Sequence, residues 1–171
     1  MAIARVRGFG KSGLLRDKDV KALMGKVPEV HVSNPHLMDI TYVDEVVGSP
    51  GDMRQRPEQL MGATVINEAE QFSRIFIFRQ KPSGNNDLFD FRDSIYHEIG
   101  HVVYHFLVTE KQKKIWHQLH SETTFIWTVA GTNPAEHFAE MYAHYILHKE
   151  STERFFPREY SFLKNEVFLA A

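Results

Sequence analysis

The stretch SIYHEIGHVVYHFL, Ser94–Leu107, carries the pattern that decides the fold of the second half of the chain. Its apolar residues recur at steps of three and four, which is the period of a helix that buries one face. These residues are Ile95, Ile99, Val102, Val103 and Phe106. Histidines recur every fourth residue of the same segment, at His97, His101 and His105. The stretch therefore predicts an amphipathic helix that presents a row of imidazoles.

The segment His97-Glu98-Ile99-Gly100-His101 fits the pattern H-E-x-x-H. Residues four apart lie on one helical face, about 6 Å apart along the axis, so two imidazoles can converge on one zinc ion. Glu98 is rotated by about 100° from His97 and flanks the ion, where it can act as general base on a water that zinc acidifies. His105 is about 12 Å from His97 along the axis, too far to share an ion with it. We expect His105 to be a bystander or to face the substrate.

A third metal ligand is expected on a second long helix within residues 132–150, capped by Asn133 with Pro134 at its first position. Glu136 and Glu140 lie one turn apart on it. We assign Glu136 as the ligand and Glu140 as the carboxylate that holds the N–H of His97 or His101. The spacing from Asn133 to Glu136 also fits a capping box, in which Glu136 would serve only its own helix and Glu140 would become the ligand.

Two further histidines of this helix differ in their position around the helix axis relative to Glu136. His137 points about 100° away from Glu136 and is not expected to bind the metal. His144 lies two turns beyond Glu136 and is a candidate residue of the cleft.

The order of elements along the chain predicts an α+β fold. We expect a short helix at 17–25, extended segments before residue 80, and helices after Asp90, with Asp90 and Asp93 as candidate caps. The expected extended segments are KVPEVHVS (26–33), MDITYVDEVVG (38–48), ATVINEA (63–69) and SRIFIFRQ (73–80), the last of them buried on both faces. Polar turn-rich segments at 49–62 and 81–87 separate them. Residues 110–121 are expected to form a helical connector, and 151–170 a turn and a last helix.

Composition limits the classes of protein to consider. The chain has 171 residues, of which 43% are hydrophobic and 25% charged, which is typical of one globular domain. We expect residues 1–171 to form a single domain, with 1–89 mainly strands and loops and 90–171 mainly helical. A net charge of −2 offers no basic field for nucleic acid, and the absence of cysteine excludes thiol catalysis and cysteine zinc sites. No apolar run spans a bilayer and no signal peptide is evident, so we expect a cytoplasmic protein without a membrane partner.

The two motifs together resemble the gluzincin zinc metallopeptidases, in which a glutamate on a second helix completes a His-His-Glu site. The block TNPAEHFAEMYAHYI is most similar to the glutamate helix of the anthrax lethal factor catalytic domain and the Pro-Pro endopeptidases. The resemblance covers about 35 residues in two blocks. It implies His97, His101 and Glu136 as ligands of one zinc ion, Glu98 as the base and Glu140 as the outer carboxylate.

The chain departs from that family at one position. The relatives place an oxyanion-stabilising tyrosine about two helical turns before the ligand glutamate, where this chain has Val129. Alternative candidates for that role are His117, His120, His144, Tyr142 and Tyr104. The relatives are also exported, whereas intracellular metallopeptidases that cleave repressors have similar motifs and suit a cytoplasmic chain better.

These observations predict a zinc-dependent peptidase, an endopeptidase rather than an exopeptidase, that acts on a protein or peptide. The substrate would add as a strand to an exposed sheet edge at RIFIFRQ or ATVINEA. One alternative is a non-catalytic zinc-containing binding protein, which would hold its ion by four protein ligands instead of three. Another is a zinc hydrolase of a non-peptide amide. The sequence predicts no oligomeric state.

Overall fold

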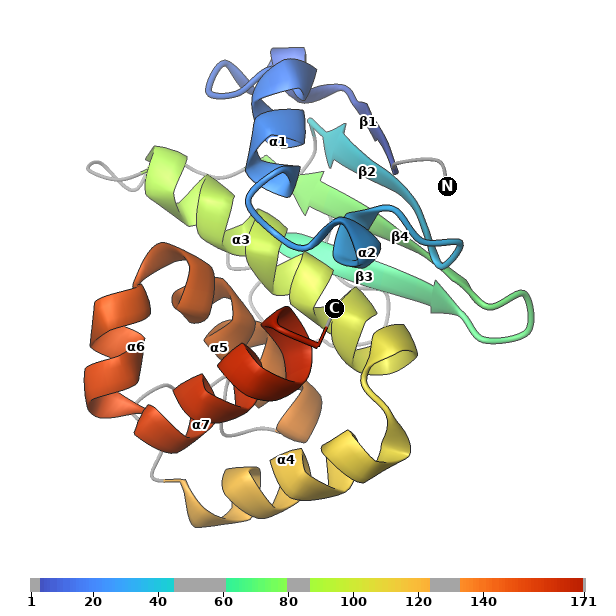
Figure 1. Ribbon diagram of the computed structural model, residues 1–171. Helices are drawn as coiled ribbons and strands as arrows, with labels where there is room; N and C mark the ends of the chain where they lie inside the picture. The colour runs from blue at the N-terminus through green and yellow to red at the C-terminus, as the bar shows by residue number, and fades with distance from the viewer. Residues whose placement is uncertain (1–3, 45–60, 80–86, 124–132, 171) are drawn as a thin grey trace.

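The computed structural model describes residues 4–44, 61–79, 87–123 and 133–170. Its architecture is α+β, with a mixed sheet on one side, a group of C-terminal helices on the other, and helix α3 (Asp87–Val102) between them (Figure 1). The expected α+β class is therefore confirmed. No helix among the described residues combines the length and the apolar character that a bilayer crossing needs.

The sheet has four strands in the order β1-β2-β4-β3. β2 is parallel to both β1 and β4, whereas β3 is antiparallel to β4 and forms a hairpin with it. The strands are β1 (Arg5–Arg7), β2 (Leu37–Val43), β3 (Gly62–Asn67) and β4 (Phe72–Phe78). β4 is therefore a central strand, and β3 is an edge strand of the sheet as described.

One face of the sheet packs against α3. Ile40, Ile75 and Ile77 point to that face and are fully buried, as is Ile99 of the helix. The opposite face of β4 is only half-buried at Phe76, so the expectation that this strand is buried on both faces is only partly met. Successive side chains of a strand point to opposite faces of the sheet. A helix that packs on one face therefore buries only every second residue of β4.

The remaining helices mostly match the predicted segments. They are α1 (Asp17–Met24), α2 (Glu29–Val32), α4 (Glu110–Glu122), α5 (Pro134–Leu147), α6 (Lys149–Phe155) and α7 (Pro157–Phe162), with a 3-10 helix at Phe9–Ser12 and π-helical turns at Val103–Leu107 and Leu163–Phe168. The helix expected at 17–25 ends at Gly25, its C-cap, as predicted. The connector expected at 110–121 is α4, with a Thr109–Gln112 capping box. α5 begins as predicted, with Asn133 as the N-cap and Pro134 in the first turn.

Three expectations about local structure are wrong. Residues 29–32 form a helical turn instead of an extended segment, because the fold buries His31 and Val32 on one side of it. Helix α3 begins at Asp87, so Asp90 and Asp93 lie inside it and do not cap it. The single last helix is replaced by α6, α7 and a π-helical turn, with the break placed just before Pro157, which cannot continue a helix. The segments 49–60 and 81–86, expected to be loops, lie outside the described residues.

Candidate metal centre

Helices α3 and α5 approach each other closely at Gly100. A Cβ atom at this position would lie 2.9 Å from Cα of Ala139 and 3.1 Å from Cβ of Tyr142. Real side chains do not tolerate the first distance, and the Ala139 backbone cannot move aside. Glycine in the HEIGH segment therefore permits the approach that brings the histidine face of α3 to the glutamate face of α5.

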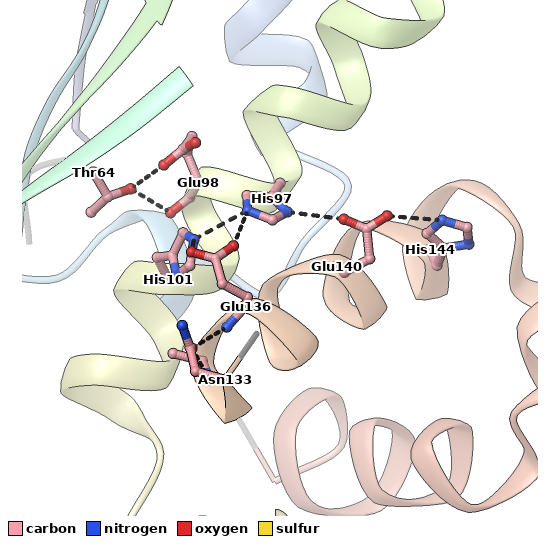
Figure 2. Close-up of polar contacts among 9 residues, drawn as sticks. Thr64, His97, Glu98, His101, Asn133, Glu136, Glu140 and His144 are labelled. Atoms are coloured by element: carbon pink, nitrogen blue, oxygen red, sulfur yellow. Dashed lines mark hydrogen bonds and ion pairs between the residues drawn. The ribbon is translucent and has the colours of Figure 1, made fainter. Parts of the chain in front are cut away.

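The imidazoles of His97 and His101 converge, as their spacing predicts. Their Nε2 atoms are 3.1 Å apart and their rings are nearly perpendicular, at 80°. Both side chains remain partly accessible, at 16% and 17% exposure. The two nitrogens thus point to one place that solvent or a ligand can reach (Figure 2).

Glu136 faces this pair from α5. Its Oε2 lies 3.2 Å from Nε2 of His97, and its Oε1 lies 3.5 Å from Nε2 of His101. The N-terminus of α5 is satisfied by Asn133, whose Oδ1 accepts from the backbone N–H groups of Ala135 and Glu136. The Glu136 carboxylate is therefore turned to the histidines and does not complete a capping box.

These three residues fit a zinc ion in ligand type and spacing. Zn–N and Zn–O bonds of about 2.0–2.1 Å in a tetrahedron place neighbouring ligand atoms about 3.3 Å apart. The two histidine nitrogens are 3.1 Å apart, and they lie 3.2 and 3.5 Å from the two different oxygens of Glu136. With one ligand atom taken from each residue, the three atoms lie within 4.8 Å of one another. Within the described ranges, His97, His101 and Glu136 form the group that could hold a metal ion, and neither Glu140 nor His105 is part of it.

Glu140 lies behind His97. Its Oε2 is 3.3 Å from Nδ1 of His97, and its Oε1 is 3.6 Å from Nε2 of His144 (Figure 2). A carboxylate on Nδ1 keeps the proton there and leaves Nε2 free as a metal ligand. Burial raises the pKa of Glu140, but its contacts with His144 and His97 outweigh this and lower the pKa to about 2. The carboxyl group of Glu140 is therefore ionised at neutral pH.

The cluster favours a positive charge. Burial lowers the pKa of His97, but its hydrogen bonds to Glu136 and Glu140 outweigh this effect and raise the pKa to about 10. Burial also raises the pKa of Glu136, while hydrogen bonds to His101 and His97 hold it well below its usual range. Two carboxylates that stabilise a proton on an imidazole would likewise stabilise a metal cation in its place.

Glu98 is buried at 5% exposure between α3 and the sheet. Its Oε2 accepts a hydrogen bond of 2.6 Å from the hydroxyl of Thr64 on β3. Burial raises the pKa of Glu98 above its usual value, while His97 and His101 lower it. The charges of the two imidazoles therefore act on this carboxylate and favour its anionic form.

Most of the other candidate residues lie elsewhere. Tyr142 is fully buried and its hydroxyl lies 2.8 Å from Nδ1 of His31, so it does not line the site. The ring of His120 lies 5.4 Å from that of His137, which itself packs on Trp116. His137 therefore points away from the metal group, as predicted.

Two further candidates contact each other. The hydroxyl of Tyr104 lies 2.8 Å from Nε2 of His117, at an exposed position between the π-helical turn after α3 and helix α4. His105 lies beside Phe106 on the same turn, and burial lowers its pKa. His144 contacts Glu140. Val129 lies outside the described residues.

The sequence did not reveal the contacts of Glu98 with β3. Thr64 lies 34 residues before Glu98 and Gly62 lies two residues earlier, and no motif marks them. The contact of His144 with Glu140 follows from their spacing of four on a helix and could have been predicted.

Comparison with known proteins adds no relative to this description. No protein-family model matches the chain, and no curated protein matches it in sequence. The function must therefore be argued from the site itself.

Proposed function

We propose that this protein is a zinc-dependent metallopeptidase of the zincin-like, gluzincin type, with Glu98 as the general base. The observation that carries the proposal is the convergence of His97, His101 and Glu136 on one point, with a buried carboxylate beside them. Three protein ligands leave one position of a tetrahedral ion open for water or substrate, as in catalytic zinc sites.

Zinc in this position would polarise a carbonyl group and lower the pKa of a water molecule. The chain supplies the proton transfers. Glu98 accepts a proton from the attacking water and then donates it to the leaving amine. Its burial, which raises its pKa, favours the first transfer, because the carboxylate then holds a proton more firmly than an exposed carboxylate would. Glu140 and His144 keep His97 oriented.

The substrate is proposed to be a peptide that pairs with the edge of the sheet. β3 offers that edge, whereas β4 is hydrogen-bonded on both sides by β2 and β3. Of the two segments expected to receive a peptide, ATVINEA is therefore favoured and RIFIFRQ is not. The same strand contacts Glu98, so a peptide added there would pass close to the base.

The non-catalytic alternative is less well supported. A purely structural zinc site has four protein ligands and no use for a buried base. The described residues supply three ligands and also bury Glu98 beside them.

The first prediction separates metal binding from catalysis. We expect the zinc-loaded protein to cleave members of a mixed peptide library, and mass spectrometry would detect the products. Glu98→Gln should lower the rate of cleavage by about 10²–10⁴-fold. Zinc content should stay at one ion per chain, because Glu98 is not a ligand. Glu150→Gln, on an exposed part of α6, is the matched control and should cleave as the wild type does. Full activity of the Glu98→Gln variant would contradict the proposed mechanism.

A further inference from the structure

Two residues of β3 enclose the carboxylate of Glu98. Gly62 and Thr64 are two positions apart, so they lie on the same face of the strand, the face that meets α3. Figure 2 shows Thr64 reaching from the strand to Glu98. The strand that carries them is the sheet edge next to the proposed metal site.

The Thr64 hydroxyl holds one oxygen of the base. It lies 2.6 Å from Oε2 of Glu98 and 3.1 Å from the Glu98 backbone carbonyl. A hydroxyl has one proton to donate, and the shorter distance is typical of an O–H donor to a carboxylate anion. Among the described residues, this is the hydrogen bond made to the Glu98 carboxylate.

Gly62 leaves the space that the other oxygen occupies. A Cβ atom at this position would lie 2.7 Å from Oε1 and 2.8 Å from Cγ of Glu98. Any other residue would force the buried carboxylate to move, because the side chain of Glu98 has only 5% of its surface exposed.

We propose that Thr64 and Gly62 are positioning residues for the general base. Thr64 fixes Oε2 by its hydrogen bond, and Gly62 provides the cavity for Oε1, so that the carboxylate keeps one orientation beside the histidines. This inference rests on the proposed function, because orientation matters only if Glu98 transfers protons. A shift of about 1 Å in a reacting group can cost about 10²-fold in rate.

The alternative is a purely structural hydrogen bond, which would affect folding and not the chemical step. The two roles are separated by Thr64→Val, which keeps the shape of the side chain and removes its donor. We expect kcat to fall by about 10–100-fold, with KM and bound zinc unchanged. Thr64→Ser keeps the donor and should restore most of kcat. Gly62→Ala should lower kcat at least as far as Thr64→Val.

Val30→Thr is the matched control. It makes the reverse exchange at a 37% exposed position on α2, outside the strand proposed to bind the peptide. We expect its kcat to equal that of the wild type.

A second measurement does not depend on turnover. In protein loaded with cobalt(II) in place of zinc, the visible absorption spectrum reports the surroundings of the metal. A reoriented Glu98 beside the ion should change that spectrum in Thr64→Val, while Thr64→Ser and Val30→Thr keep the wild-type spectrum.

The outcomes are distinct. A Thr64→Val variant with wild-type kcat and spectrum, in a protein that Glu98→Gln inactivates, overturns the positioning role and leaves the proposed function standing. Equal losses in Thr64→Val and Thr64→Ser also overturn it, because the donor would then not matter. A zinc-loaded wild type that cleaves nothing overturns the proposed function, and the positioning role with it.

Discussion

Two histidines of this protein pair with polar groups of α5, and the structure pushes their protonation in opposite directions. His97 lies between the carboxylates of Glu136 and Glu140, and its pKa is raised to about 10. His31 pairs with the hydroxyl of Tyr142, and burial lowers its pKa to about 4. Both contacts join α5 to an earlier segment of the chain, but only the first attracts a positive charge.

The two histidines differ in the charge of their partners and in their exposure to solvent. His31 is 2% exposed and its partner is a neutral group, so the pair is stable only while the imidazole stays uncharged. His97 is 16% exposed and its partners are anions, so a cation is favoured there and can enter. A buried histidine is therefore not by itself a sign of a metal site. Carboxylates and imidazoles that converge on one solvent-accessible point are such a sign.

The largest effect is expected from Glu136→Gln, which replaces a charged ligand with a neutral amide of the same shape. We expect zinc affinity to fall by more than about 100-fold, beyond the roughly 10–100-fold cost of losing an outer partner. Competition with a chromophoric chelator at neutral pH measures the change. Glu150→Gln serves again as the control with unchanged affinity.

A smaller effect is expected from Glu140→Gln, which keeps a hydrogen-bonding group near Nδ1 of His97 but removes its charge. Zinc affinity should fall by about 10–100-fold, measured in the same competition assay. The assignment of the two glutamates would be reversed if Glu140→Gln released the metal and Glu136→Gln retained it.

The sequence predicted the helices of the metal site because local rules govern them. The apolar period places α3, and Asn133-Pro134 places the start of α5. The convergence of His97 with His101 needs only the geometry of one helix. The choice between Glu136 and Glu140 needed the packing of two helices, which Gly100 permits but which no local pattern specifies.

Contacts between segments that are distant in the chain could not be predicted in this way. Thr64 reaches Glu98 only because β3 forms the sheet edge and its register turns residue 64 inward. The sequence predicts an extended segment at 26–33, but residues 29–32 form a helical turn in which His31 packs against Tyr142. In both cases tertiary contacts decide the local structure.

The smallest effect concerns the other member of the comparison, His31. Its pKa is lowered from 6.5 to about 4 by burial, so the unfolded chain binds a proton at a higher pH than the folded protein does. Stability is therefore fully retained above pH 6.5 and falls as the pH drops towards 4, with His31 accounting for about 2 kcal/mol at pH 5. Urea unfolding at pH 7 and pH 5, with a chelator present, measures the fall in the free energy of unfolding between the two pH values. This fall should be smaller by about 2 kcal/mol in the double variant His31→Phe, Tyr142→Phe than in the wild type. The control Tyr142→Phe keeps the titrating histidine and should lose as much free energy of unfolding as the wild type. If the double variant also loses as much as the wild type, His31 is not the group that titrates.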